Sequence, residues 1–92
     1  MASPAEVAND MAAQAAFWVK RDKKIGLACA DAATIIRKFL NEDRVDGRTY
    51  FGLRRRLLDL SVNRYYGSFG IVRNLDRALR TLQVLHGKAV EK

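Results

Sequence analysis

Apolar residues recur at helical spacing in four stretches of the chain, and this periodicity constrains the fold more than any other feature. The clearest stretch follows the i, i+3, i+4, i+7 pattern over four turns and consists of Ile25, Ala28, Cys29, Ala32, Ile35, Ile36 and Phe39. No stretch alternates with the period of two that a half-buried strand shows. The only proline is residue 4, so proline interrupts none of these stretches. The pattern predicts an all-α fold.

Caps and breakers give approximate bounds for the helices. Ser3-Pro4-Ala5-Glu6 is a capping box with proline at the first helical position. Asp22 and Asp46 are candidate N-caps for the second and third helices. Gly87 is a candidate C′ residue, which would end the last helix near His86. These signals predict a compact bundle of about four helices at residues 4–20, 22–40, 48–60 and 70–86.

Each of the other three helices has its own apolar stripe. The first helix has Val7, Met11, Ala15 and Trp18. The third has Tyr50, Leu53, Leu57 and Leu60, with Phe51 and Leu58 beside them, and the fourth has Val72, Leu75, Leu79, Leu82 and Leu85 or His86. Ala8, Ala12 and Ala16 form a flat strip that would let another helix, or a second copy of the chain, approach closely. The link after the first helix is so short that the first two helices must form an antiparallel hairpin or one kinked helix.

A chain of 92 residues corresponds to one domain, covering residues 1–92. Its charge is unevenly distributed. Residues 1–46 carry seven Lys or Arg and seven Asp or Glu, whereas residues 47–92 carry ten and three, which is the whole net charge of +7. The sequence therefore predicts a neutral helical hairpin (1–46), a basic helical half (47–87) and a frayed tail (88–92).

The basic half contains arginines that share helix faces. Arg73, Arg77 and Arg80 fall at i, i+4 and i+7, opposite the leucines of the last helix. On the third helix Arg55 points most directly away from the leucine stripe, with Arg48 near it. This half holds eight Arg and two Lys. Guanidinium groups form bidentate hydrogen bonds to phosphate or carboxylate, whereas Lys supplies mainly a point charge.

The segment between the third and fourth helices combines Arg64, Tyr65, Tyr66 and Phe69 with Gly67 and Gly70. Aromatic rings beside arginine suit stacking on unpaired bases, and they suit a protein hot spot equally well. A third interpretation is that one or two rings fold back and close the core. The candidate binding residues are therefore Arg48, Arg55, Arg64, Tyr65, Tyr66, Arg73, Arg77 and Arg80.

The sequence offers little for catalysis or for a metal. Cys29 lies on an apolar stripe, which favours a buried thiol, and a single cysteine allows no disulfide within the chain and no zinc site built on cysteine pairs. His86 at a helix end favours a structural or surface role. The acidic group Glu42, Asp43 and Asp46 lacks the spacing of a calcium loop. We expect no catalytic residue, no metal, no cofactor and no enzyme.

The N-terminus shows no secretory signal, and the apolar stretches are far too short for a membrane span, so a cytoplasmic protein with no membrane partner is expected. One interpretation of the basic half is a solvated face that binds nothing, and an Arg-rich genome would also produce the excess of arginine. Two binding functions remain open beside it. The first is a non-enzymatic nucleic-acid-binding module that contacts the phosphate backbone through its Arg-rich half. The alternative is an inhibitor, adaptor or assembly subunit whose basic face docks on an acidic protein, a kind of protein that phages and mobile elements often encode. No pair of helices has both the short link and the polar second helix that a helix-turn-helix needs.

Overall fold

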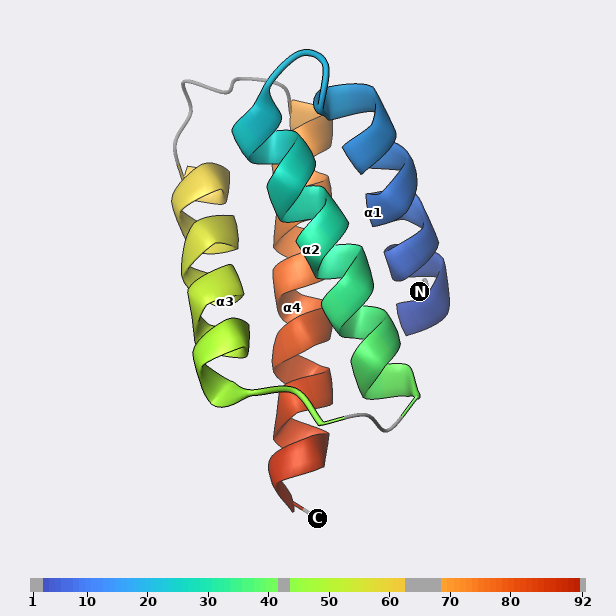
Figure 1. Cartoon of the computed structure of the whole chain (residues 1–92), viewed down its shortest axis with the longest axis vertical. Coiled ribbons are helices and arrows are strands. Elements are labelled where there is room, and N and C mark those ends of the chain that lie inside the picture. The colour runs from blue at the N-terminus through green and yellow to red at the C-terminus, as the bar shows by residue number, and fades with distance from the viewer. Residues whose placement is uncertain (1–2, 42–43, 63–68, 92) are drawn as a thin grey trace.

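The computed structural model describes residues 3–41, 44–62 and 69–91, and within these ranges the chain forms four helices. They are α1 (Pro4–Trp18), α2 (Lys23–Leu40), α3 (Gly47–Val62) and α4 (Phe69–Glu91). The helices run up, down, up and down beside one another, and α4 lies behind α2 in the view of Figure 1. The all-α fold and the four-helix bundle are confirmed.

The three predicted N-caps are present. Ser3 accepts a hydrogen bond from the backbone N–H of Glu6 at 3.2 Å. The Asp22 carboxylate accepts hydrogen bonds from the backbone N–H groups of the second and third residues of α2. Asp46 accepts from the N–H of Thr49 at 3.3 Å. Since each cap satisfies a backbone donor that has no partner within its helix, these short polar side chains fix where α1, α2 and α3 begin.

One hydrophobic cluster draws residues from all four helices. The predicted stripe of α2 is buried from Ile25 to Ile36, with Phe39 packed at its edge. On α3 the buried residues are Tyr50, Leu53, Leu57 and Leu60, as the spacing predicts, whereas Phe51 and Leu58, expected beside this stripe, are exposed. On α4 the core also takes in Ile71 and Ala78. Helical periodicity therefore predicts the core side of each helix correctly.

The hairpin of α1 and α2 is held by an unusually close approach at its turn. α1 ends at Trp18, two residues before the predicted end, and the Trp18 carbonyl accepts hydrogen bonds from the N–H groups of Arg21 and Asp22. Gly26, in the first turns of α2, lies directly against the backbone of Val19. A Cβ atom on Gly26 would lie 2.6 Å from the Val19 Cα. Only glycine allows this contact, so Gly26 lets α1 and α2 meet closely at the turn of their antiparallel hairpin.

The predicted end of α4 is wrong. The helix passes through Gly87 and continues to Glu91, so residues 88–91, predicted as a tail, extend the helix. Glycine inside a helix costs only about 1 kcal/mol relative to alanine, and the residues that follow carry no proline to stop the helix. This last stretch of α4 projects beyond the lower end of the other helices (Figure 1).

Candidate functional site

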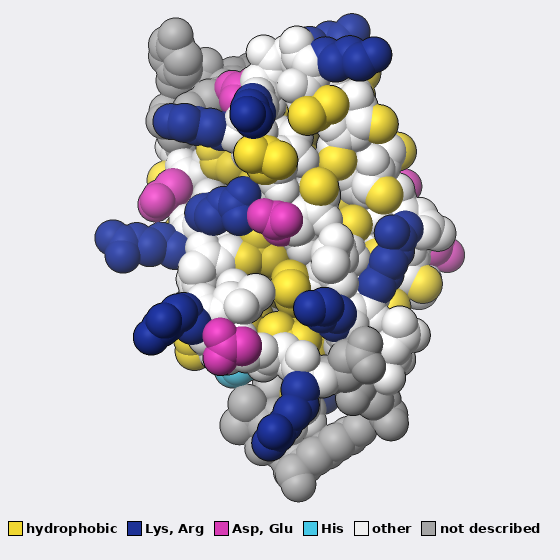
Figure 2. Space-filling model, viewed as in Figure 1, with side chains coloured by type: hydrophobic (Ala, Val, Ile, Leu, Met, Phe, Trp, Pro, Cys, Tyr) yellow, Lys and Arg dark blue, Asp and Glu magenta, His cyan; other side chains and the backbone are white. Residues whose placement is uncertain are grey.

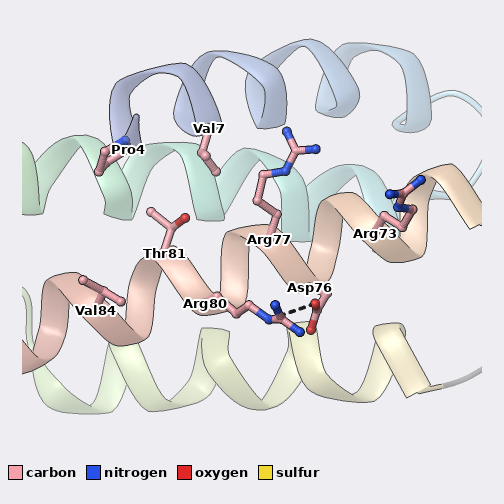
Figure 3. A pocket seen from close by; sticks show the side chains of 8 residues that line it. All are labelled: Pro4, Val7, Arg73, Asp76, Arg77, Arg80, Thr81 and Val84. Atoms are coloured by element: carbon pink, nitrogen blue, oxygen red, sulfur yellow. Dashed lines mark ion pairs between the residues drawn. The ribbon is translucent and has the colours of Figure 1, made fainter. Parts of the chain in front are cut away.

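The three arginines of α4 lie on one side of an open groove. Arg73, Arg77 and Arg80 are all exposed and line the same groove between α1 and α4, together with Asp76, Thr81, Val84, Pro4 and Val7. They come from successive turns of α4, and α1 contributes the apolar rim opposite them (Figure 3). The i, i+4, i+7 spacing therefore places the Cα atoms of three arginines along about 10 Å of α4. Their guanidinium groups point in different directions: Arg77 turns towards α1, whereas Arg80 turns to Asp76 (Figure 3).

Two carboxylates partly offset this charge. Arg80 Nε lies 3.1 Å from Asp76 Oδ2, one turn away on the same helix. Arg77 extends towards α1 and reaches Asp10 Oδ2 at 3.5 Å (Figure 3 shows its direction). The Arg80 side chain is 78% exposed, and such solvated ion pairs contribute about 0–1 kcal/mol. Both arginines can therefore exchange their carboxylate for another anion at little cost.

The two arginines predicted on α3 do not belong to this groove. Arg48 and Arg55 are exposed on the outer side of α3, opposite its buried leucines. Within the run Arg54–Arg55–Arg56, the guanidinium of Arg56 turns to α2 instead and lies 2.6 Å from Asp31. The three consecutive arginines of α3 therefore point in different directions, because adjacent residues lie on different sides of a helix.

The other three predicted site residues, Arg64, Tyr65 and Tyr66, lie outside the described residues. The same holds for Glu42 and Asp43 of the acidic segment. Of that segment, Asp46 is described and acts as the cap of α3.

The hairpin that is neutral as a whole has a basic end. Its turn and the first residues of α2 carry Lys20, Arg21, Lys23 and Lys24, against the single carboxylate of Asp22. Arg21 is held in place there, because its guanidinium lies 3.8 Å above the ring of Phe17 and donates to the Phe17 carbonyl at 2.8 Å. On the face shown in Figure 2, Lys and Arg side chains are spread with Asp and Glu between them.

Aromatic rings gather where α2 ends and α3 begins. The imidazole of His86 stacks on the ring of Tyr50, with centroids 3.9 Å apart and planes 5° from parallel. Phe39 and Phe51 pack edge-on against the same imidazole. Burial raises the pKa of the Tyr50 hydroxyl above its ordinary value of 10.0, against the opposing positive charge of Arg54. His86 therefore packs against aromatic rings, in agreement with the structural or surface role expected from its place near the end of the last helix.

Cys29 is fully buried in α2, as predicted. Burial raises the pKa of its thiol from an ordinary value of 9.0 to about 11, because a thiolate would lose its hydration. The reactive form of a cysteine is the thiolate, so this side chain is a small apolar core residue under neutral conditions.

Raising the pH should reduce the stability of the protein because the Cys29 thiol is buried. Between pH 9.0 and about 11 the unfolded chain releases the Cys29 proton while the folded chain retains it. The free energy of unfolding should then fall by about 2–3 kcal/mol across that window from this group alone. Denaturant titrations of the natural chain and of Cys29→Ala at several pH values measure it. Cys29→Ala should lose this part of the pH dependence. If the free energy of unfolding fell equally with pH in the variant and in the natural chain, Cys29 would not be its source.

Comparisons of the chain with protein-family models, curated proteins and solved structures find no match. No described helix is both long enough and apolar enough to cross a membrane. Residues 3–41, 44–62 and 69–91 contain no group of three or more His, Cys, Asp and Glu that could hold a metal ion. The candidate site therefore rests on the physical character of its own residues.

Several members of the groove have only weak sequence signals. Asp76 could have been found from the i, i+4 spacing to Arg80, and Thr81 and Val84 from the turn that continues the arginine side of α4. Pro4, Val7 and Asp10 come from α1 and have no local signal. Their place beside α4 depends on how the first helix packs on the last.

Proposed function

We propose that this protein is a nucleic-acid-binding module that holds the phosphate backbone with α4. The observation that carries the proposal is a set of three exposed arginines of α4, Arg73, Arg77 and Arg80, which all line the groove between α1 and α4. The net charge of +7 supplies long-range attraction to a polyanion.

Guanidinium chemistry supports a phosphate ligand. Each arginine offers a planar fork of donors that matches two phosphate oxygens. The present partners, Asp76 and Asp10, occupy only part of that capacity through exposed contacts. A phosphate can therefore replace a carboxylate without disturbing the core, because neither ion pair is buried.

The mode of recognition follows from the bundle. Each helix in Figure 1 runs beside an antiparallel neighbour, an arrangement unlike the crossed pair that presents a recognition helix to the major groove. The proposal is therefore contact with phosphates, which sets affinity and orientation, in place of direct reading of base edges. The half-buried Pro4 and the exposed Val84, which also line the groove, can pack against sugars or an unstacked base beside those phosphates.

The proposal is tested by fluorescence polarisation with labelled duplex and single-stranded oligonucleotides over a salt series. If three arginines each neutralise one phosphate, the slope of log K against log salt should be about −2.7 for duplex DNA. Affinity should then fall roughly 40-fold between about 50 and about 200 mM salt. Absence of binding to every oligonucleotide at the lowest salt would refute the proposal.

Removing the carboxylate of Asp76 should strengthen binding. Asp76→Asn frees Arg80 from its ion pair and removes a negative charge from the groove, so affinity should rise several-fold at low salt. Asp59→Asn, an equal charge change on exposed α3, is the matched control and should change affinity less. Equal gains in both variants would mean that net charge acts and that the α4 groove does not.

A further inference from the structure

A second surface stands apart from the groove, on the outer side of α3. Three of its apolar side chains face solvent: Phe51 is 52% exposed, Leu58 46% and Val62 67%. They are separated by seven and four residues, so they lie within about 40° of one another around the helix axis. This exposed stripe lies on the side of α3 that is turned away from the buried Leu53 and Leu57. α3 is therefore apolar on two sides, and the bundle buries only one of them; on the other side, Phe51 also packs edge-on against His86 of α4.

Two arginines complete the stripe in a regular pattern. Arg48, Phe51, Arg55, Leu58 and Val62 are spaced by three, four, three and four residues, which is the a and d spacing of a coiled-coil seam. We call these five residues the α3 seam. A seam of this kind is narrower than the face that a helix buries in a globular core or a membrane surface. Its geometry fits one further helix lying along α3.

The charge of the seam identifies the kind of helix. Arg48 and Arg55 alternate with the apolar residues, and Arg54 lies on its flank with its guanidinium carbon 6.0 Å from the centroid of the Phe51 ring. Within the described part of the chain, no ion pair involves any of these three arginines. Carboxylates placed opposite the arginines would be attracted, and lysines there would be repelled.

A second copy of this chain does not place carboxylates opposite the two seam arginines, Arg48 and Arg55. A parallel pair would place Arg48 and Arg55 against the same arginines, and an antiparallel pair would place them against Phe51 or Leu58. Neither arrangement brings a carboxylate to Arg48 or Arg55; in a parallel pair the exposed Asp59 would lie opposite only the flanking Arg54. We propose that the α3 seam docks an acidic amphipathic helix of another protein, with leucine-like residues against Phe51, Leu58 and Val62. The seam spans about 21 Å, so the bound helix has about four turns.

The test uses the full chain and a synthetic fluorescein-labelled helix of about 21 residues, built with Glu opposite the two seam arginines and Leu opposite the three apolar residues. Fluorescence polarisation should show tighter binding to this peptide than to a scrambled one. Phe51→Ser combined with Leu58→Ser should weaken binding at least about tenfold. Leu27→Ser, which changes a side chain 44% exposed on α2, is the matched control and should leave binding unchanged.

Charge reversal separates the proposal from a general loss of structure. Arg48→Glu combined with Arg55→Glu should abolish binding of the Glu peptide and create binding of a Lys counterpart, a gain that an unfolded variant cannot show. Failure of the preference to switch would overturn the proposal. So would equal binding of the scrambled peptide, or a dimer of the natural chain that Phe51→Ser with Leu58→Ser dissociates.

The surface on α3 is independent of the proposed nucleic-acid groove, and the two can fail separately. A variant with alanine at Arg73, Arg77 and Arg80 should keep the peptide affinity of the natural chain. Duplex DNA should not displace the peptide. If DNA displaces it and the charge-reversed seam loses DNA binding, the seam belongs to the nucleic-acid surface and the docking proposal is wrong.

Discussion

Gly26→Ala should destabilise this protein by about 2 kcal/mol or more. The added Cβ would lie 2.6 Å from both the Cα and the N atom of Val19, which are backbone atoms that cannot rotate away. Overpacking of this kind costs about 1–3 kcal/mol, and relief requires α1 and α2 to separate at their turn. The loss is large because a domain of this size has a total stability of about 5–10 kcal/mol.

The matched control is Gly52→Ala on α3, where nothing lies within 4 Å of the added Cβ. Alanine there should stabilise the protein by about 0.5–1 kcal/mol, because it favours the helix without a clash. Thermal unfolding followed by circular dichroism should separate the two variants by more than about 10 °C. A Gly26→Ala protein as stable as the natural chain would show that the close approach of the hairpin is not present in solution.

Replacing Arg73, Arg77 and Arg80 together by alanine should weaken nucleic-acid binding roughly a hundredfold or more at about 0.1 M salt. The variant loses three phosphate contacts, so the slope of log K against log salt should become less steep by about 2.7. Its thermal unfolding should change little, because the ion pairs that it removes are exposed. The salt slope is the decisive measurement, since it counts the contacts that were lost.

The control variant removes the same charge from other parts of the surface. Arg37, Lys38 and Arg44 are exposed at the end of α2 and in the segment that follows it. With alanine at these three positions the protein should retain most of its affinity, because screening limits the reach of a charge to about 10 Å at this salt concentration. Equal losses in the two variants would show that net charge binds the nucleic acid and that α4 has no special part.

The fold could be predicted from the sequence because its signals are local. The i, i+3, i+4 pattern from Ile25 to Ile36 marks the buried side of α2 by itself, and Ser3 and Asp22 cap their helices through residues two or three positions away. The error at Gly87 has the same origin. A glycine signals a helix end only weakly, and the residues after it decide whether the helix continues.

The candidate site was less predictable because its walls come from separate parts of the chain. The side of α4 that carries Arg77 follows from periodicity, but the approach of Asp10 on α1 depends on tertiary packing. The α3 seam illustrates the same limit. Its three-four spacing can be found in the sequence, yet Phe51 and Leu58 could equally have been core residues beside Leu57. Because α2 and α4 pack against the other side of α3, Leu58 lies in solvent, and Phe51 stays half exposed while it packs edge-on against His86.

The antiparallel hairpin of α1 and α2 also bears on how the chain reaches its native state. Its close contact joins Val19 and Gly26, which are only seven residues apart, so it can form after the closure of a very small loop. Helical bundles whose contacts are mostly local fold in microseconds to milliseconds. If this hairpin forms in the folding transition state, strain at Gly26 slows folding more than it speeds unfolding.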